Sequence, residues 1–208
     1  MDSDADYYLV ADSDKKIYLI DRNSAGFKSI PLSTVEKTRS SAELKFSQVE
    51  GDKISDDPDI FDEAWNAGLV GLAADTLGAA QYALDQAVTY ANQREQFNRV
   101  IASFQAVKHM CAEMAAQLEP CRAMVWYAAH AFRDIPDEST MMASHTKAHL
   151  SEVGQFVTRT ATEVHGGMGF TDLVGLHYWF KRCGFNRQAL GSPELLRDRA
   201  AIAQDLVP

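Results

Sequence analysis

A stretch that begins at Arg94 carries residue types able to bind a phosphate-bearing ligand. It reads REQFNRVIASFQ and opens the second long helical segment of the chain. A guanidinium near a helix start favours anions, because its planar fork and the exposed main-chain amides both donate hydrogen bonds to phosphate oxygens. The alternative is an arginine that simply lies in solvent at a helix end.

A second stretch, HGGMGFT, runs from His165 to Thr171 at the end of an amphipathic helical pattern. Three of its residues, Gly166, Gly167 and Gly169, are glycines that allow main-chain amides to approach a ligand closely. The alternative is a helix cap and turn, for which one glycine is sufficient. His165 by itself is more typical of a structural hydrogen-bonding residue than of a catalyst.

Two histidines and a glutamate could form part of a metal site. His145, His149 and Glu152 are spaced i, i+4 and i+7 along one predicted helix. A zinc site of the helical type has a glutamate directly after the first histidine and a further ligand elsewhere, and neither is marked here. The sequence therefore predicts no metal site.

The composition narrows the class of protein. The chain has 208 residues, of which 46% are hydrophobic and 24% charged, as in ordinary globular proteins. Its net charge of −9 argues against a nucleic-acid surface, so an anionic ligand must meet locally placed cations. Cys111, Cys121 and Cys183 are odd in number and widely spaced, which favours reduced thiols packed as small apolar groups. No signal peptide or long apolar run is present, which predicts a cytoplasmic protein without a membrane segment.

Residues 1–55 are predicted to form a partial β-domain. Strand patterns separated by turn residues cover Tyr7 to Ala11, Lys16 to Ile20, Lys28 to Leu32 and Ala42 to Val49. Four short strands without a partner sheet would expose edges and an apolar face. Either they pair with another chain, or this chain is a piece of something longer.

Residues 56–208 are predicted to form a helical bundle. From Phe104 to Phe132, apolar residues recur every three or four positions, as in the seam of a bundle, with Pro120 inside the seam as an expected kink. Similar patterns cover residues 60–93, 138–164, 173–189 and 193–206. Short connections between them predict antiparallel neighbours. The fold class expected is mainly α, an antiparallel four-helix bundle preceded by the partial β-domain.

The stretches REQFNRVIASFQAVKHMCAEMA and ATEVHGGMGFTDLVGLHYWFKR resemble the two best-known signatures of the acyl-CoA dehydrogenase family. The strand part, ADYYLVADSDKKIYLIDRNSAGF with TRSSAELKF, is similar to the second half of that family's central β-domain. The segments LHYWFKR and GSPE look like the subunits of the actinobacterial sterol-degrading branch, which form heterotetramers. The resemblance covers essentially the whole chain, whereas the family's N-terminal helical domain and first β-half have no counterpart here.

The resemblance implies a set of FAD-binding residues. Arg94, Phe97 and Gln105 match positions at which the family contacts the FAD of a neighbouring subunit. The family's QxxGG segment along the flavin's adenosine and pyrophosphate matches the run Glu163, Val164, His165, Gly166 and Gly167. Its leading glutamine is here Glu163, a carboxylate that would be costly near phosphates unless it were protonated or turned away.

The resemblance also locates the catalytic base, and this chain departs from the family there. The segment Ala189 to Ser192 matches the family's Tyr-Glu-Gly-Thr segment, in which the glutamate takes the α-proton of the acyl-CoA; here that position is Leu190, and Ser192 matches a flavin contact. Some members carry the base on the first bundle helix, at the position of Gly68. Neither residue can accept a proton, so no catalytic residue is expected in this chain.

Three functional interpretations follow. The first is an acyl-CoA dehydrogenase-like flavoprotein subunit that shares a FAD site with a partner, in a homo- or hetero-oligomer acting on an acyl-CoA thioester. The second is a fragment of a full-length enzyme. The third is a non-enzymatic oligomeric helical module without FAD. In every case the isolated chain is expected to be inactive.

Overall fold

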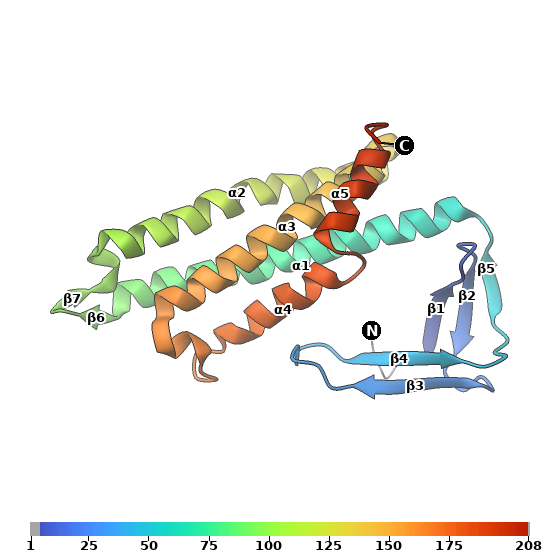
Figure 1. The fold of residues 1–208 in the computed structure, drawn as a ribbon, viewed down its shortest axis with the longest axis horizontal. Helices are drawn as coiled ribbons and strands as arrows, with labels where there is room; N and C mark the ends of the chain where they lie inside the picture. The colour runs from blue at the N-terminus through green and yellow to red at the C-terminus, as the bar shows by residue number, and fades with distance from the viewer. Residues whose placement is uncertain (1–4, 208) are drawn as a thin grey trace. The chain divides into compact units, whose positions relative to one another are not determined.

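The computed structural model describes residues 5–207, which belong to two compact units that divide between Trp65 and Asn66. The first unit contains five strands and the second is helical (Figure 1). One helix, α1 (Pro58–Gln93), begins in the first unit and continues through the second.

The first unit contains two small antiparallel sheets. One has the strand order β1 (Tyr7–Ala11), β2 (Ile17–Asp21), β5 (Asp52–Ser55), and the other pairs β3 (Phe27–Leu32) with β4 (Ser41–Phe46). The four strands expected from the sequence are present. They pair within the chain, and a fifth strand, β5, which the sequence did not predict, pairs with β2. Main-chain pairing determines β5, because its four residues, DKIS, carry little apolar alternation.

A small aromatic cluster joins the two sheets. Tyr8 from β1, Ile20 from β2 and Phe27 from β3 are buried together. The rings of Tyr8 and Phe27 have centroids 4.8 Å apart in a tilted arrangement, a favourable geometry for aromatic pairs. By contrast, Tyr7 and Leu9 on β1 are 60% and 72% exposed. The first unit therefore has a narrow core and leaves apolar side chains in solvent.

The second unit is an antiparallel bundle, which confirms the predicted fold class. After α1, the helices α2 (Gln105–Asp134), α3 (Pro136–His165) and α4 (Leu176–Gln188) run alternately up and down, and α5 (Pro193–Ile202) packs on α3 (Figure 1). Helix α2 continues unbroken through Pro120 on an exposed face, where water can hydrogen-bond the carbonyl that has lost its partner.

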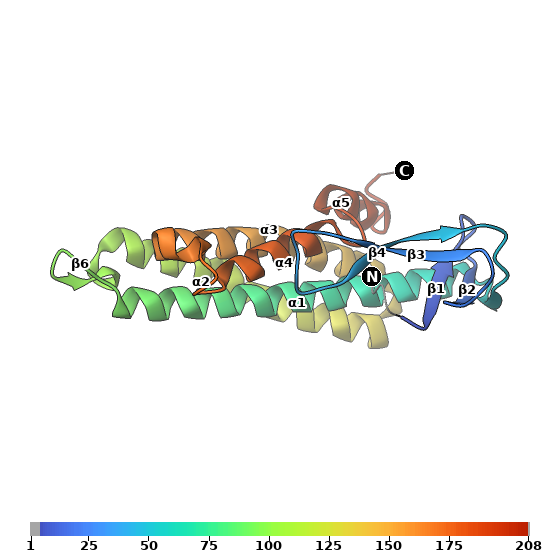
Figure 2. The same ribbon diagram turned by 90° about the horizontal axis from the view of Figure 1, so that it is seen from below.

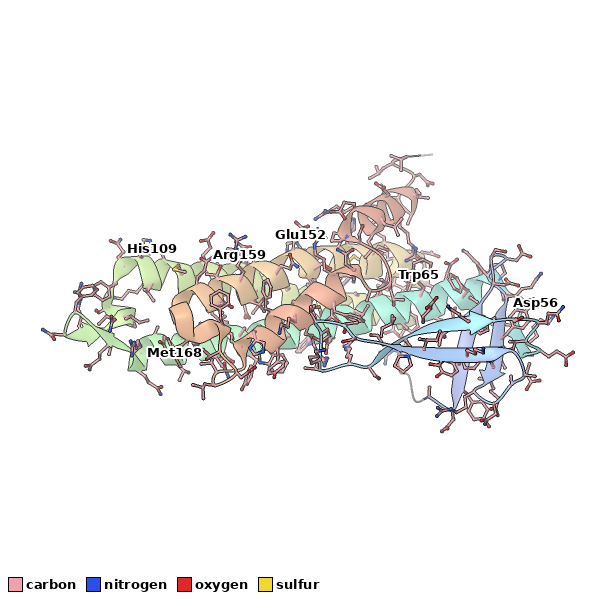
Figure 3. The ribbon with its side chains drawn as sticks, turned by 60° about the horizontal axis from the view of Figure 1, so that its bottom comes forward. Asp56, Trp65, His109, Glu152, Arg159 and Met168 are labelled. Atoms are coloured by element: carbon pink, nitrogen blue, oxygen red, sulfur yellow. The ribbon has the colours of Figure 1, made fainter. Side chains whose placement is uncertain are left out.

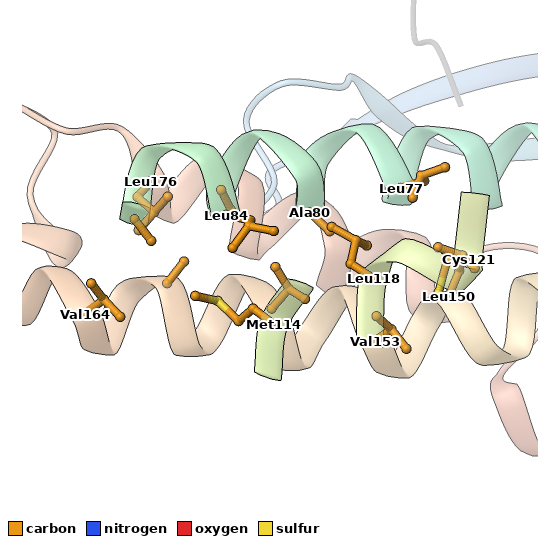
Figure 4. Close-up of a cluster of buried hydrophobic side chains, with 14 of the residues drawn as sticks. Leu77, Ala80, Leu84, Met114, Leu118, Cys121, Leu150, Val153, Val164 and Leu176 are labelled. Carbon is orange, nitrogen blue, oxygen red and sulfur yellow. The ribbon is translucent and has the colours of Figure 1, made fainter. Parts of the chain in front are cut away.

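The core of the bundle lies between α1, α2 and α3. Figure 4 shows Leu84 of α1, Met114 and Leu118 of α2 and Leu150 of α3 within it. The face that α1 presents consists mostly of alanines, buried at positions 73, 80, 83, 87 and 91. Small side chains let a helix approach its neighbours closely, and the larger residues of α2 and α3 fill the space. The apolar seam predicted for the second long helix is therefore its buried face.

Two local features complete the bundle. The three cysteines are all free thiols, and burial raises the pKa of Cys121 to about 11. Helix α5 begins at Pro193 with Ser192 as its cap, whose Oγ accepts a hydrogen bond of 3.4 Å from the amide of Leu195. It ends at Ile202, four residues before the end expected from the sequence. Within residues 5–207, no helix is both long and apolar enough to cross a bilayer.

Candidate functional site

The stretch that begins at Arg94 forms a hairpin between α1 and α2. Strands β6 (Glu95–Gln96) and β7 (Arg99–Val100) are joined by Phe97 and Asn98, with φ angles of 55° and 59°. Two consecutive residues with positive φ are the mark of a tight hairpin turn, and asparagine tolerates this conformation well. The ring of Phe97 lies at the tip and is 87% exposed.

Arg94 does not lie at a helix start, and this part of the sequence-based expectation is wrong. Its amide donates to the carbonyl of Tyr90 at 2.8 Å, so it extends the C-terminal end of α1, where the helix dipole favours cations rather than anions. Its side chain is exposed, and within residues 5–207 no ion pair or hydrogen bond engages the guanidinium. Any phosphate contact therefore depends on the guanidinium alone.

Gln105, not Arg94, occupies the helix start. It is the first residue of α2, whose preceding residue, Phe104, makes no side-chain cap to the free amides. The Gln105 side chain is exposed, with its Nε2 3.5 Å from Nε2 of His109 one turn later. Arg94, Phe97 and Gln105 are thus brought together by one hairpin and are all open to solvent.

The glycine-rich stretch begins where α3 ends and forms a short 3₁₀ turn over residues 166–170. Gly166 has a φ of 60° and a ψ of −140°, a conformation that only glycine adopts readily, so it serves as the helix cap. Gly169 is required by packing, because a Cβ there would lie 2.8 Å from the carbonyl oxygen of Thr162. Gly167 is exposed, and among residues 5–207 no atom beyond its two chain neighbours lies within 4 Å of the point its Cβ would occupy. Packing within this part of the chain therefore does not require a glycine at position 167.

His165 has a structural role in this chain. It is 4% exposed, and its Nδ1 lies 2.7 Å from the carbonyl oxygen of Ala161, one turn earlier in α3. Its ring stacks on that of Tyr90 from α1, with centroids 4.4 Å apart. The stack joins the C-terminal ends of α1 and α3. The hydrogen-bond contact and the stack together fix the position of the imidazole.

The other two residues of the segment differ in exposure. Val164 belongs to the buried core of the bundle. The carboxylate of Glu163 is exposed and accepts a hydrogen bond of 3.3 Å from Nε of Arg159, one turn earlier on the same helix. Its negative charge is therefore partly balanced, which bears on the cost of a carboxylate near phosphates.

The hairpin and the glycine segment lie at the same end of the bundle. Figure 3 places His109, one turn after Gln105, and Met168, next to the glycines, at that end. The stack of His165 on Tyr90 independently joins the two segments, since Tyr90 precedes Arg94 by one turn. We name this group of exposed residues the distal group: Arg94, Phe97, Gln105, Glu163, Gly166 and Gly167.

The two positions identified as base positions lie against each other elsewhere in the bundle. Cδ1 of Leu190 lies 2.6 Å from the point that a Cβ on Gly68 of α1 would occupy. Leu190 is in the turn between α4 and α5, with a φ of 57°, and is followed by Gly191 with a φ of 117°. Residue 68 must be very small for Leu190 to take this position. We name Gly68, Leu190 and Ser192 the proximal group.

Two acidic side chains, Glu194 just after this turn and Glu152 of α3, pair with arginines. Oε1 of Glu194 accepts a hydrogen bond of 3.2 Å from Arg187, and the two oxygens of Glu152 lie 3.4 Å from Arg187 and 3.5 Å from Arg197. Hydrogen bonds from its own main-chain amide and from Ser192 lower the pKa of Glu194, and the charge of Arg187 lowers it further. A carboxylate with a lowered pKa is a weak proton acceptor.

A buried lysine that the sequence analysis did not single out holds the same turn. Lys147 of α3 is 1% exposed, and its Nζ donates hydrogen bonds of 2.9 Å to the carbonyl of Arg187 and 2.6 Å to the carbonyl of Gly191. Burial, with a further contribution from the charge of Arg187, lowers its pKa to about 8. In the sequence, Lys147 is marked only by its place within the helical pattern of residues 138–164. That pattern does not indicate which groups its ammonium bonds.

The distal and proximal groups are far apart. Gly68 and Arg94 lie on and directly after the same helix, and a rise of about 1.5 Å per residue separates them by about 40 Å. A groove between α3 and α4, with a volume of about 540 Å³, contains Glu152 and Arg187 at one part and Arg159 and Glu163 at another. Figure 2 shows these two helices side by side.

Two of the three residues considered for metal binding, His145 and Glu152, contact other side chains. Nε2 of His145 lies 3.2 Å from Nε2 of Gln204, and the carboxylate of Glu152 pairs with arginines. Among residues 5–207 no three side chains of histidine, cysteine, aspartate or glutamate cluster in a way that could hold a metal ion.

Comparison with known proteins identifies relatives of the chain. Residues 59–204 match the C-terminal domain of acyl-CoA dehydrogenases. The acyl-CoA dehydrogenase IpdE2 of Mycobacterium tuberculosis is 34% identical over 172 residues, which is 82% of this chain and 50% of that protein. The caffeyl-CoA reductase–Etf complex subunit CarC of Acetobacterium woodii is 36% identical over 118 residues, which is 57% of this chain and 31% of that protein.

A solved structure gives the same result for the fold. Butyryl-CoA dehydrogenase from Megasphaera elsdenii superposes with a TM-score of 0.86 at 25% identity, over 96% of this chain and 56% of that protein. The chain therefore spans between 31% and 56% of the length of these three relatives.

Proposed function

We propose a function from the premise that this chain belongs to the acyl-CoA dehydrogenase family, as the match over residues 59–204 establishes. Proteins of this family normally bind FAD and oxidise acyl-CoA thioesters. Our proposal is that this chain is a subunit of such an enzyme. It completes a FAD site together with a second acyl-CoA dehydrogenase-like subunit, and it does not supply the catalytic base.

The exposed residues of the distal group fit a flavin dinucleotide. Arg94 offers an exposed guanidinium that no side chain of residues 5–207 engages, suited to a pyrophosphate. Phe97 offers an exposed ring for an apolar or aromatic contact, and Gly167 lies in open space where main-chain amides are accessible. The carboxylate of Glu163 fits a phosphate-bearing ligand less well, but its ion pair with Arg159 partly neutralises its charge. Bound FAD would supply the acceptor for the hydride of the substrate.

The distance between the two groups supports a shared site. Gly68 of the proximal group and Arg94 of the distal group are about 40 Å apart along α1, which is farther than one extended flavin dinucleotide reaches. If Arg94 and the turn at Gly68 both border FAD, as the family resemblance implies, they border different molecules of it. Each of those sites then needs residues from another chain.

The contact between Leu190 and Gly68 carries the proposal that this chain lacks a base. Dehydrogenation requires a group that takes the α-proton as the hydride leaves, and a hydrocarbon side chain cannot do this. Both base positions known for the family converge at this contact, and neither has a carboxylate. The nearby Glu194 has a lowered pKa and pairs with Arg187, so it is a poor substitute. We assign the base to the partner subunit.

The nature of the partner follows from the same reasoning. It must itself resemble an acyl-CoA dehydrogenase, because it has to supply the catalytic carboxylate and its own contacts to the shared flavin. The relative CarC is named as a subunit of a complex, and IpdE2 is a mycobacterial acyl-CoA dehydrogenase. The resemblance of LHYWFKR and GSPE to the actinobacterial sterol-degrading branch favours assembly of the heterotetrameric type, acting on an acyl-CoA thioester.

Purification of the tagged chain from its native cells tests this function. We expect a second acyl-CoA dehydrogenase-like polypeptide, identified by mass spectrometry, in equal amount, together with the absorbance of bound FAD. A chain that purifies alone, colourless and unable to take up added FAD, would show that it is a helical module without flavin.

A further inference from the structure

Lys147 is the largest side chain among those fully buried in the bundle. It lies on α3, and its ammonium reaches two main-chain carbonyls, those of Arg187 at the end of α4 and Gly191 in the following turn. A charged group inside a protein is costly unless it is well hydrogen-bonded, and hydrogen bonds from a charged donor are among the strongest in proteins. These two bonds therefore give the turn a fixed point on α3.

The turn needs such a fixed point because its main chain is strained. Leu190 adopts a positive φ of 57°, which is unfavourable for a branched side chain. Gly191 follows with a φ of 117°, and its amide donates to the carbonyl of Gln188 at 3.2 Å. The two carbonyls bonded by Lys147 flank Leu190 on either side. Releasing them would allow the turn to relax to a less strained form.

Lys147 cannot act directly on a ligand. Its Nζ is covered by the turn that it bonds, and the side chain has almost no exposed surface. Oγ of Ser151 donates a hydrogen bond of 2.7 Å to the main-chain carbonyl of Lys147, a bond within α3 that does not involve the ammonium. Any effect of Lys147 on function must therefore be transmitted through the position of Leu190.

We infer that Lys147 is a positioning residue: by bonding the carbonyls of Arg187 and Gly191, it locks the α4–α5 turn in its strained form and holds Leu190 against Gly68. Leu190 then forms a fixed apolar wall over the first bundle helix. The inference rests on the proposed function only in that this wall would border the flavin site.

Amide hydrogen exchange of the complete chain tests the inference without any flavin. The reporters are the amides of Ala189 and Gly191, which donate to the carbonyls of Phe185 and Gln188. Lys147→Met keeps most of the side-chain volume and removes both hydrogen bonds. We expect exchange at these two amides to become faster by about 10- to 100-fold, with little change in α1. Ser151→Ala, a buried change one turn away that leaves the turn untouched, should not accelerate them.

A second readout separates positioning from general stability. The energetic coupling between positions 68 and 190, measured by a double-mutant cycle, should fall towards zero in the Lys147→Met background and persist in Ser151→Ala. Unchanged exchange at Ala189 and Gly191 in a folded Lys147→Met variant would overturn the inference. If that variant does not fold, amide exchange of the wild-type protein tests the inference instead. The amides of Ala189 and Gly191 should then exchange as slowly as those of the flanking helices. Exchange as fast as in an open turn would show that Lys147 does not hold the turn in place. None of these results depends on whether FAD binds, so failure of the lock and failure of the proposed function remain distinguishable.

Discussion

Leu190 of the α4–α5 turn occupies the space that a side chain on Gly68 of α1 would need, with its Cδ1 2.6 Å from the position of that missing Cβ. Two positions separated by more than half of the chain are thus sterically linked. The contact involves the flexible end of a leucine, so a larger residue at 68 is accommodated only if Leu190 moves. This relationship gives a prediction that does not depend on cofactor or partner.

Gly68→Ala should not give the stabilisation that is usual for a glycine-to-alanine change inside a helix. That change normally adds about 0.5–1 kcal/mol, but here displacement of Leu190 offsets the gain. In a Leu190→Ala background the gain should appear. Gly71→Ala, on the same helix, is the matched control, because within residues 5–207 no atom other than the adjoining helix backbone lies within 4 Å of its Cβ position. It should stabilise both backgrounds equally, as measured by urea unfolding. Equal effects of Gly68→Ala in the two backgrounds would refute the link.

The pH dependence of stability should carry the signature of Lys147. Burial lowers its pKa to about 8 from an ordinary 10.5, so between these values the unfolded chain binds more protons than the folded chain. Stability due to this group therefore rises as pH increases from about 8 towards 10.5, with a slope of at most about 1.4 kcal/mol per pH unit. The free energy of unfolding, measured with denaturant from pH 7 to pH 10, should rise with this slope in wild type relative to Lys147→Met. In the control variant Lys181→Met, at a partly exposed lysine, the pH dependence should stay that of wild type. Parallel pH curves for wild type and Lys147→Met would contradict the assignment.

Arg94→Ala should weaken flavin retention by about 1.5–3 kcal/mol, the usual size of a hydrogen bond to a charged group. The guanidinium has no internal partner within residues 5–207, so its removal should leave the fold intact. Equilibrium dialysis of FAD against the assembled complex measures the effect. Arg122→Ala, an exposed arginine in the middle of α2, should leave the affinity unchanged. An equal affinity in wild type and Arg94→Ala would remove Arg94 from the flavin site.

The chain should be part of an oligomer. Tyr7 and Leu9, two positions apart on β1, are both largely exposed, and Trp126 of α2 is 72% exposed. Exposed apolar side chains that lie together on one face indicate an interaction surface. Light scattering after size exclusion should give a mass well above 23.0 kDa. A stable species at that mass over a range of concentrations would exclude an obligate assembly.

The sequence predicts the helices of this fold better than it predicts the site. The seam from Met114 to Val125 is regular because one face of α2 is buried along its length, and such periodicity is local. The expectation that Arg94 lies at the start of the second long helix is wrong, because a two-residue ladder such as β6–β7 is too short to produce an apolar pattern in the sequence. Only the positive φ angles of Phe97 and Asn98 reveal the turn.

The contacts of Lys147 and Leu190 could not have been predicted from spacing. Lys147 bonds main-chain carbonyls that are 40 and 44 residues away, and carbonyls leave no trace in a residue pattern. Likewise, Gly68 is one of several glycines in α1, and only its partner distinguishes it from Gly71 and Gly78. The family resemblance marked positions 68 and 190 separately, whereas their mutual contact is a finding of the structure.

Dye-linked oxidation of acyl-CoA thioesters tests the central claim, that this chain completes a flavin site without supplying the base. The purified chain alone, supplied with FAD, should not reduce the dye, since loss of a positioned base typically costs a factor of about 10²–10⁴ and the flavin site that we propose needs the partner subunit. Leu190→Glu in the lone chain should not restore activity, whereas addition of the partner subunit should. Dye reduction by the single wild-type chain at ordinary enzymatic rates would contradict the account and would require another residue, with Glu163 and Glu194 the first to examine, to take the proton.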